Sequence, residues 1–159
     1  MASSSSSVKK YDVFISFRGE DTRWGFTSFL YDALCDKGIK TFVDEDDLEK
    51  GDQISPVLLE AIEASAIAVI VFSKNYAQSS WCLDELNHIV HCMKEDKLLV
   101  LPVFYKVDPT DIRHGRGSFG VAFLQHQIRF RNDPAKVAKW RESLEFTANL
   151  PDWRSADKR

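Results

Sequence analysis

The sequence predicts one α/β domain in which helices cover both faces of a doubly wound parallel β-sheet. Short apolar runs, rich in β-branched and aromatic residues, alternate with segments whose apolar residues recur at helical spacing. Strands that alternate with helices in this way are typical of a parallel sheet. The length of 159 residues suffices for one domain with a core and is too short for two domains of ordinary size.

The two ends of the chain are expected to lie outside this domain. Residues 1–9 form a serine-rich tail, for which we expect disorder because it has almost no apolar surface to bury. The domain itself is expected over residues 10–153. Residues 154–159 are interpreted as a C-terminal tail or the start of a linker.

The first strand is predicted over Val13–Phe17, and a helix follows it. Asp21 and Thr22 offer an N-cap for this helix, and Gly38 ends it. Its apolar residues recur at the spacing of one helical face: Phe26, Phe29, Leu30, Ala33 and Leu34. We therefore expect this whole stripe to face the core.

The next elements are a strand over Ile39–Val43, an acidic loop, a second helix and a third strand. Ser55 as N-cap and Pro56 at the first helical position begin the second helix. The strand Ala66–Phe72 is the most continuous apolar run, as expected for a strand that is buried on both faces.

A third helix begins at Ser79-Ser80, and a fourth strand is predicted over Leu98–Tyr105. Pro102 cannot donate a backbone hydrogen bond, so this strand should lie near an open edge of the sheet. The four strands should be parallel, in the spatial order second, first, third, fourth. Beyond them the pattern predicts short helical pieces up to Phe130, no clear fifth strand, and a last helix capped by Asp133.

Charge and hydropathy exclude two kinds of partner. A net charge of −3 and a pI near 5.8 give no electrostatic reason to bind nucleic acid or an anionic membrane. No apolar run approaches the roughly 20 residues that span a bilayer, and the N-terminus lacks a secretory signal. We expect a location in the cytoplasm, with the nucleus as a second site.

Several alternative sites were weighed and set aside. Four residues of the third helix, Cys82, His88, His91 and Cys92, could in principle bind a metal, but at helical spacing they point to different sides. We therefore expect no metal and reduced thiols. The segment Gly115–Gly120 spells G-x-G-x-x-G, yet it does not follow a first strand, so it is not interpreted as a dinucleotide site. The sequence has no P-loop.

Ligands of open parallel sheets bind outside the carboxyl ends of the strands. Three predicted loops lie there, namely Arg18–Arg23, Asp44–Gln53 and Ser73–Trp81. In the first loop, Arg18 and Arg23 flank Gly19. They could pair with neighbouring acidic residues, or they could contact a pyrophosphate or ribose, which the planar guanidinium suits.

Glu85 is the carboxylate of most interest. Helical geometry puts it about 85° from the centre of the apolar stripe of its helix, and so on the flank. A flank glutamate is usually just solvated. Its neighbours favour a site instead, because Trp81 can stack on a flat ring, and Ser79 and Asn75 can hydrogen-bond hydroxyl groups.

Several ordered segments closely resemble the motifs of plant Toll/interleukin-1 receptor (TIR) domains. The opening motif is Tyr11–Arg23, with the sequence YDVFISFRGEDTR. The later motifs are Phe72–Leu86, Leu101–Pro109, Gly117–Gly120, Trp140–Leu144 and Ala148–Leu150. The resemblance covers about Tyr11 to Trp153.

This resemblance implies a flavodoxin-like sheet of five parallel strands and cleavage of NAD⁺, with NADP⁺ as a second substrate and no cofactor. The catalytic glutamate of the family falls on Glu85. Arg18, Gly19, Ser79 and Trp81 match positions that line the nucleotide cleft, and we add Arg23 to this substrate-binding set.

The resemblance also implies self-association with other TIR domains. The segment 44–54, with Lys50 and Gly51, matches the "BB loop", which makes head-to-tail contacts. Many relatives have Ser-His where this chain has Ser28 and Phe29, so a helix interface at that position is left open. Association should be weak for the isolated domain, and downstream immune signalling proteins are the further partners expected.

The function that follows is that of an NAD⁺ nucleosidase in a plant immune receptor, activated by self-association to trigger defence and cell death. The alternative is a TIR module that only assembles and has no catalytic activity.

Overall fold

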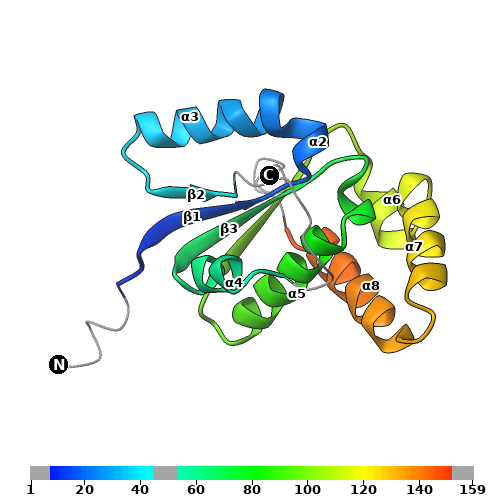
Figure 1. The fold of residues 1–159 in the computed structure, drawn as a ribbon. Coiled ribbons are helices and arrows are strands. Elements are labelled where there is room, and N and C mark those ends of the chain that lie inside the picture. Colours follow the sequence, from blue (N-terminus) through cyan, green and yellow to red (C-terminus); the bar gives the residue numbers. More distant parts are fainter. Residues whose placement is uncertain (1–7, 45–53, 152–159) are drawn as a thin grey trace.

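The computed structural model describes residues 8–44 and 54–151, which form a parallel sheet with helices on both faces (Figure 1). The strands are β1 (Tyr11–Ser16), β2 (Thr41–Val43), β3 (Ser65–Phe72) and β4 (Leu99–Phe104). The helices are α2 (Gly19–Thr22), α3 (Ser28–Asp36), α4 (Pro56–Glu63), α5 (Ser80–Lys94), α6 (Pro109–His114), α7 (Ser118–Arg129) and α8 (Pro134–Ala148). A π-helical turn, η1 (Arg23–Thr27), joins α2 to α3, and a 3₁₀ helix, η2 (Tyr76–Gln78), precedes α5.

The sheet has the strand order β2-β1-β3-β4, and every neighbouring pair is parallel. This confirms the predicted fold class and the predicted spatial order, with strand ends displaced by one or two residues. Because the strands are parallel, their carboxyl ends meet at one edge of the sheet. The loops after β1 and β3 therefore lie next to each other at that edge.

Within the described residues the sheet has four strands rather than the five that the resemblance implied. The segment that follows β4 forms helices instead. Asp108 caps α6 by accepting a hydrogen bond from Thr110 N at 2.9 Å, and Pro109 takes the first helical position. Gly115 ends α6 with a left-handed φ of 63°, and α7 follows at once. The described sheet thus ends at β4, as Pro102 predicts.

The two faces of the sheet pack against different helices (Figure 1). On one face, α4, α5 and α8 bury the larger core, in which Trp140 and Leu86 are fully enclosed. On the other face, α3 lies over the middle of the sheet and contributes a narrow stripe of apolar side chains. This stripe consists of Phe26, which precedes α3, and of Leu30 and Leu34 within it.

The prediction that Phe29 and Ala33 face the core is wrong. Phe29 is 73% exposed, and Ala33 is exposed as well. Successive residues of a helix are turned by about 100°, so Phe29 points well away from the side that Leu30 presents to the sheet. The expected cap at Asp21-Thr22 is also wrong, since α2 already begins at Gly19 and Asp21 lies inside it.

The other predicted helix starts are confirmed by their caps. Ser55 accepts a hydrogen bond from Val57 N at 3.2 Å, and Ser79 accepts one from Cys82 N at 3.1 Å. Asp133 likewise accepts from Lys136 N at 3.2 Å. These side chains satisfy backbone N–H groups that the first turn of a helix leaves without partners.

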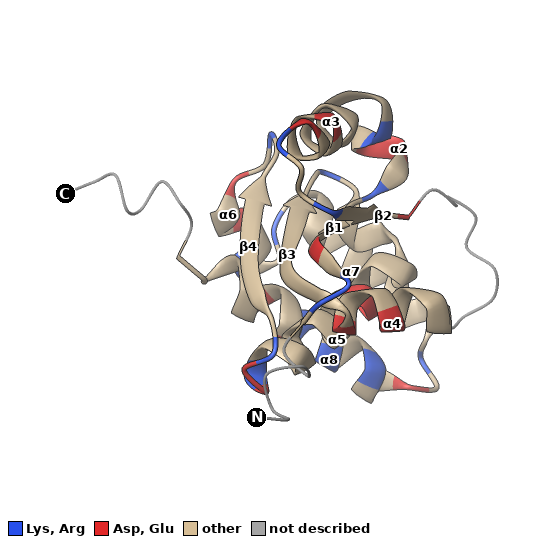
Figure 2. Ribbon diagram, turned by 90° about the vertical axis from the view of Figure 1, so that its left-hand side faces the viewer, with Lys and Arg blue, Asp and Glu red and all other residues tan. Residues whose placement is uncertain are grey.

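Apart from Asp12 in β1, the charged residues of the described ranges lie on the helices and loops, and β3 and β4 contain none (Figure 2). None of the helices in the described ranges is long and apolar enough to span a membrane. The two histidines of α5 each contact a carboxylate, His88 with Glu63 at 2.8 Å and His91 with Glu95 at 3.4 Å. Of the three cysteines, Cys35 is exposed, and Cys82 and Cys92 are buried.

Candidate active site

Helix α5 places Glu85 in its second turn, against the carboxyl end of β1. The side chain is buried, with 6% of the residue exposed. Glu85 is therefore more buried than its predicted position on the flank of the helix implied. The end of β1 and the 3₁₀ helix η2 both pack against this side of α5, and helical periodicity alone does not report such neighbours.

A chain of hydrogen bonds connects Glu85 to the interior. Ser16, the last residue of β1, donates from Oγ to Glu85 Oε1 at 2.8 Å. The same Oγ lies 2.8 Å from the hydroxyl oxygen of Tyr76, whose single proton can be donated either to Ser16 or to the backbone carbonyl of Cys82, 3.2 Å away. Ser16 and Tyr76 are both fully buried.

Burial raises the pKa of Glu85 to about 8, because a charged carboxylate is costly away from water. The hydrogen bond from Ser16 acts in the opposite direction, and the negative charges of Asp44 and Asp84 raise the pKa further. Carboxyl groups with strongly shifted pKa values are concentrated at functional sites, where burial and neighbouring charges are combined.

Trp81 lies one turn before Glu85 and is half-buried. Its indole Nε1 is buried and has no acceptor among the described residues, so it could donate a hydrogen bond to a bound molecule. Ser79 is buried as the N-cap of α5. Ser79, Trp81 and Glu85 thus all belong to the N-cap and first two turns of α5, and a shared substrate site for them stays a prediction.

The loop after β1 carries the predicted arginines. Arg18 forms an ion pair with Glu20 at 3.6 Å, and the Arg23 guanidinium lies over the Phe17 ring at 5.0 Å from its centre. Gly19 begins α2. This loop also contacts α5 directly, because Cys82 Sγ donates to the Phe17 carbonyl at 3.4 Å. Arg18 is therefore next in sequence to Phe17, whose carbonyl contacts the first turn of α5.

Asp21 holds this loop to the loop that follows β3. Its carboxylate accepts from Ser73 Oγ at 2.6 Å, from Asn75 N at 2.8 Å and from Asn75 Nδ2 at 3.0 Å. The Asn75 side chain, which was predicted to bind substrate hydroxyls, is engaged here instead. Two of the three loops expected at the ligand-binding edge are therefore fastened together.

The remaining predicted residues are placed as follows. Lys50 and Gly51 lie outside the described residues. Ser28 and Phe29 begin α3, and Phe29 is exposed, as is Trp24 of η1, at 90%. Ser28 and Phe29 lie far from Glu85, because α3 and α5 pack on opposite faces of the sheet.

Sequence reasoning missed Ser16, Tyr76 and Asp21. A serine at the end of the otherwise apolar run Val13–Phe17 could have drawn attention to Ser16, because a buried hydroxyl needs a partner. Asp21 offers no comparable local signal, since its partners Ser73 and Asn75 are more than 50 residues away in the sequence.

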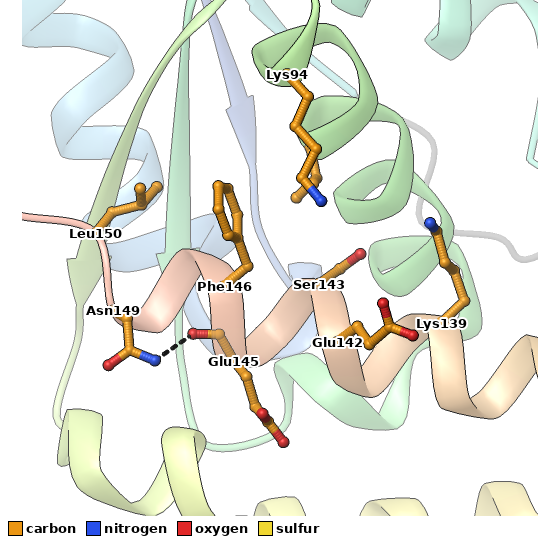
Figure 3. A pocket seen from close by; sticks show the side chains of 9 residues that line it. Lys94, Lys139, Glu142, Ser143, Glu145, Phe146, Asn149 and Leu150 are labelled. Carbon is orange, nitrogen blue, oxygen red and sulfur yellow. Dashed lines mark hydrogen bonds between the residues drawn. The ribbon is translucent and has the colours of Figure 1, made fainter.

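A pocket lies between α5 and α8 (Figure 3). It is lined by charges of both signs, including Lys94, Lys139 and Glu142. Lys94 Nζ lies 5.0 Å from the centre of the Phe146 ring, and Asn149 Nδ2 donates to the Glu145 carbonyl at 2.8 Å. Its α5 residues come from the last half of the helix, so this hollow is separate from Glu85.

Comparison with known families identifies the class of protein to which this parallel sheet, with its strand order β2-β1-β3-β4, belongs. The family model described as "TIR domain" matches residues 10–159. The chain belongs to the TIR domain family.

Several of its relatives are plant disease resistance proteins. The chain is 52% identical to "TMV resistance protein N" of Nicotiana glutinosa over 94% of its length, and 50% identical to "Disease resistance protein RPV1" of Vitis rotundifolia over 99%. It spans 13% and 11% of the length of these two relatives. Among solved structures, the TIR domains of the activated Roq1 resistosome, which directly recognises the pathogen effector XopQ, match with a TM-score of 0.84. This match has 48% identity and covers 90% of the chain and 86% of the Roq1 chain.

Proposed function

We propose that this domain cleaves the bond between nicotinamide and ribose in NAD⁺, with NADP⁺ as a second substrate, and that Glu85 is its catalytic residue. The observation that carries the proposal is the buried Glu85 carboxyl group, held by Ser16 at the carboxyl edge of the sheet. Trp81 offers a flat surface and a buried indole N–H beside it.

The chemistry needs one carboxylate. As the C–N bond breaks, its electron pair passes to the nicotinamide ring nitrogen, and nicotinamide leaves as a neutral molecule. The ribose is left as an oxocarbenium-like cation, which is attacked by water with loss of a proton to give ADP-ribose, or from within the same molecule to give a cyclised form, as in an ADP-ribosyl cyclase. Glu85 stabilises this positive charge in its ionised form, which becomes the major form only above its raised pKa of about 8. Because the nicotinamide of NAD⁺ is already cationic, the leaving group needs no general acid.

The assembled state of a relative supports a link between self-association and activity. The Roq1 TIR domains were solved in an activated resistosome. By extension, contacts between TIR domains switch this chain on, and its product signals to downstream immune proteins, ending in defence and cell death. The cytoplasm, with the nucleus as a second location, is where this signalling takes place.

The second candidate is an assembly module without catalysis. The exposed aromatic residues of η1 and α3 favour it, because Trp24 of η1 is 90% exposed and Phe29 of α3 is 73% exposed. Large exposed aromatic side chains are enriched at protein–protein contacts. Nicotinamide release separates the two candidates, since only the first requires it.

The test compares Glu85→Ala and Glu85→Gln with the unaltered chain. Both substitutions should lower nicotinamide release by about 10²-fold or more, because each removes the negative charge that stabilises the transition state. Nicotinamide is measured by chromatography, and circular dichroism checks that each variant is folded. Glu142→Gln on α8 is the matched control and should retain full activity. A folded Glu85→Ala protein with an unchanged rate would show that the site assignment is wrong.

A further inference from the structure

We propose that Ser16 and Tyr76 are positioning residues for Glu85, which they hold through a buried chain of two hydroxyl groups. The inference rests on the proposed function, because positioning matters for turnover only if Glu85 is the catalytic group. It goes beyond that function by assigning a role to a strand residue and to a residue of η2.

The chain joins three separate elements. Ser16 ends β1, Tyr76 begins η2, and Glu85 belongs to α5. Each link of the chain, from Glu85 to Ser16 and from Ser16 to Tyr76, measures 2.8 Å. The Tyr76 ring is fully enclosed and packs edge-on against Phe72, with 5.2 Å between ring centres. The hydroxyl is therefore fixed in place by packing as well as by hydrogen bonding.

The two hydroxyl groups can serve both protonation states of Glu85. When Glu85 is ionised, Tyr76 donates to Ser16 and Ser16 donates to the carboxylate. When Glu85 is protonated, it can donate to Ser16, Ser16 to Tyr76, and Tyr76 to the Cys82 carbonyl, 3.2 Å away. Each hydroxyl can act as donor and acceptor, so the side chain of Glu85 keeps its position in both states.

The chain also offsets an unfavourable environment for the charged form. Asp44, which follows β2, and Asp84 on α5 both place negative charge near Glu85. Among the described residues, Tyr76 and Cys82 also face this part of the site, and burial raises the pKa of Tyr76, so both hydroxyl protons remain available. Ser16 is the donor that favours the carboxylate in this set.

The test is the pH dependence of nicotinamide release, measured as kcat/KM on the full chain at one fixed protein concentration. Ser16→Ala removes the donor to the carboxylate. The acid limb of the profile should then move about one unit to higher pH, with about a tenfold loss of rate below that limb. Tyr76→Phe keeps the ring and should move the limb in the same direction by less. The double variant should resemble Ser16→Ala, because Tyr76 acts through Ser16.

The matched control is Ser65→Ala. Ser65 is likewise fully buried at a strand end, where its Oγ donates to the Ala61 carbonyl at 2.7 Å, but it lies at the opposite end of the sheet. Its loss should leave the pH profile where it is. Tyr76→Phe provides a second route to the answer if Ser16→Ala does not fold.

A readout independent of turnover separates this inference from the proposed function. The ¹³C chemical shift of the Glu85 carboxyl group reports its titration directly by NMR. Ser16→Ala and Tyr76→Phe should both raise the midpoint of that titration, whether or not the chain cleaves NAD⁺. Lack of nicotinamide release with displaced midpoints would refute only the enzymatic proposal. Folded variants with unmoved midpoints would overturn the positioning role itself.

Discussion

Glu85 shows how far a single residue can be predicted from sequence. The position of Glu85 near the start of α5 could be predicted from the helix cap and from the spacing of the apolar residues. Its burial did not follow, because that depends on Ser16, which is 69 positions away at the end of β1, and on Tyr76 of η2, whose packing is not readable from the spacing of α5. The helical periodicity of the sequence predicts which side of its helix a residue occupies. It does not predict how far other elements of the fold bury that side.

The raised pKa of Glu85 leads to a prediction on stability. The folded chain keeps this proton up to about pH 8, whereas an unshifted glutamate loses it near 4.5. Between these values the folded state binds more protons than the unfolded chain, so the free energy of unfolding falls as pH rises through this window. Below it, the contribution of the protonated group is fully present.

Glu85→Gln should remove this loss, because the amide resembles the protonated acid and never ionises. We expect the variant to be about 2–4 kcal/mol more stable than the unaltered chain at pH 8, and equally stable near pH 4.5. Urea unfolding at the two pH values measures the difference, with Glu142→Gln as control. Equal stability of the two proteins at pH 8 would mean that Glu85 ionises there without penalty.

At the scale of elements, the order and type of the strands and helices were predictable, and their contacts were less so. Ser55, Ser79 and Asp133 act as caps because capping involves only a few neighbouring residues. The outward direction of Phe29 was missed because its spacing fits a helical stripe that, in the folded chain, is narrower than expected. The attachment of α2 to the loop after β3 was missed for a different reason, since it involves residues far apart in sequence.

This attachment gives a prediction for Asp21. Asp21→Ala leaves the Ser73 hydroxyl and both N–H groups of Asn75 without their acceptor. It should lower the free energy of unfolding by about 1–3 kcal/mol. It should also reduce nicotinamide release, because the loop Ser73–Trp81 leads directly into α5 and the position of Glu85 depends on it.

Asp133→Ala is the matched control, since it too removes an aspartate that accepts backbone hydrogen bonds, but at the start of α8. It should lose a similar amount of stability and retain activity. Urea unfolding and nicotinamide release, measured on the same preparations, distinguish the two effects. Full activity in a destabilised Asp21→Ala protein would show that this loop attachment serves stability alone.

For the whole molecule, the fold class and the family were both predictable, because four strands in alternation with helices leave few arrangements open and the motifs are long. The residues exposed on the outer surfaces of the helices could not be predicted, since their exposure depends on which side of each helix packs against the sheet. The exposed aromatic residues of η1 and α3 emerge only from the folded structure, and they bear on assembly.

If the domain acts by self-association, specific activity should rise with protein concentration, and Phe29→Ser should weaken that rise. An interface side chain of this size commonly contributes 1 kcal/mol or more, so the concentration for half-maximal activity should increase roughly fivefold. Leu124→Ser on α7 is the matched control, because Leu124 is also an exposed apolar residue, at 62%. Specific activity that does not vary with concentration would argue against activation by assembly, and equal effects of the two substitutions would argue against the α3 surface.

The distribution of the three cysteines makes this question accessible to labelling. Burial raises the pKa of the Cys92 thiol, which keeps it protonated and poorly nucleophilic, and the Cys82 thiol is enclosed against the Phe17 carbonyl. Cys35 is exposed near the end of α3, on the same helix as Phe29. A maleimide dye will therefore attach at one position per native chain. Energy transfer between donor-labelled and acceptor-labelled copies can then follow the approach of two α3 helices directly, without altering any residue of the protein.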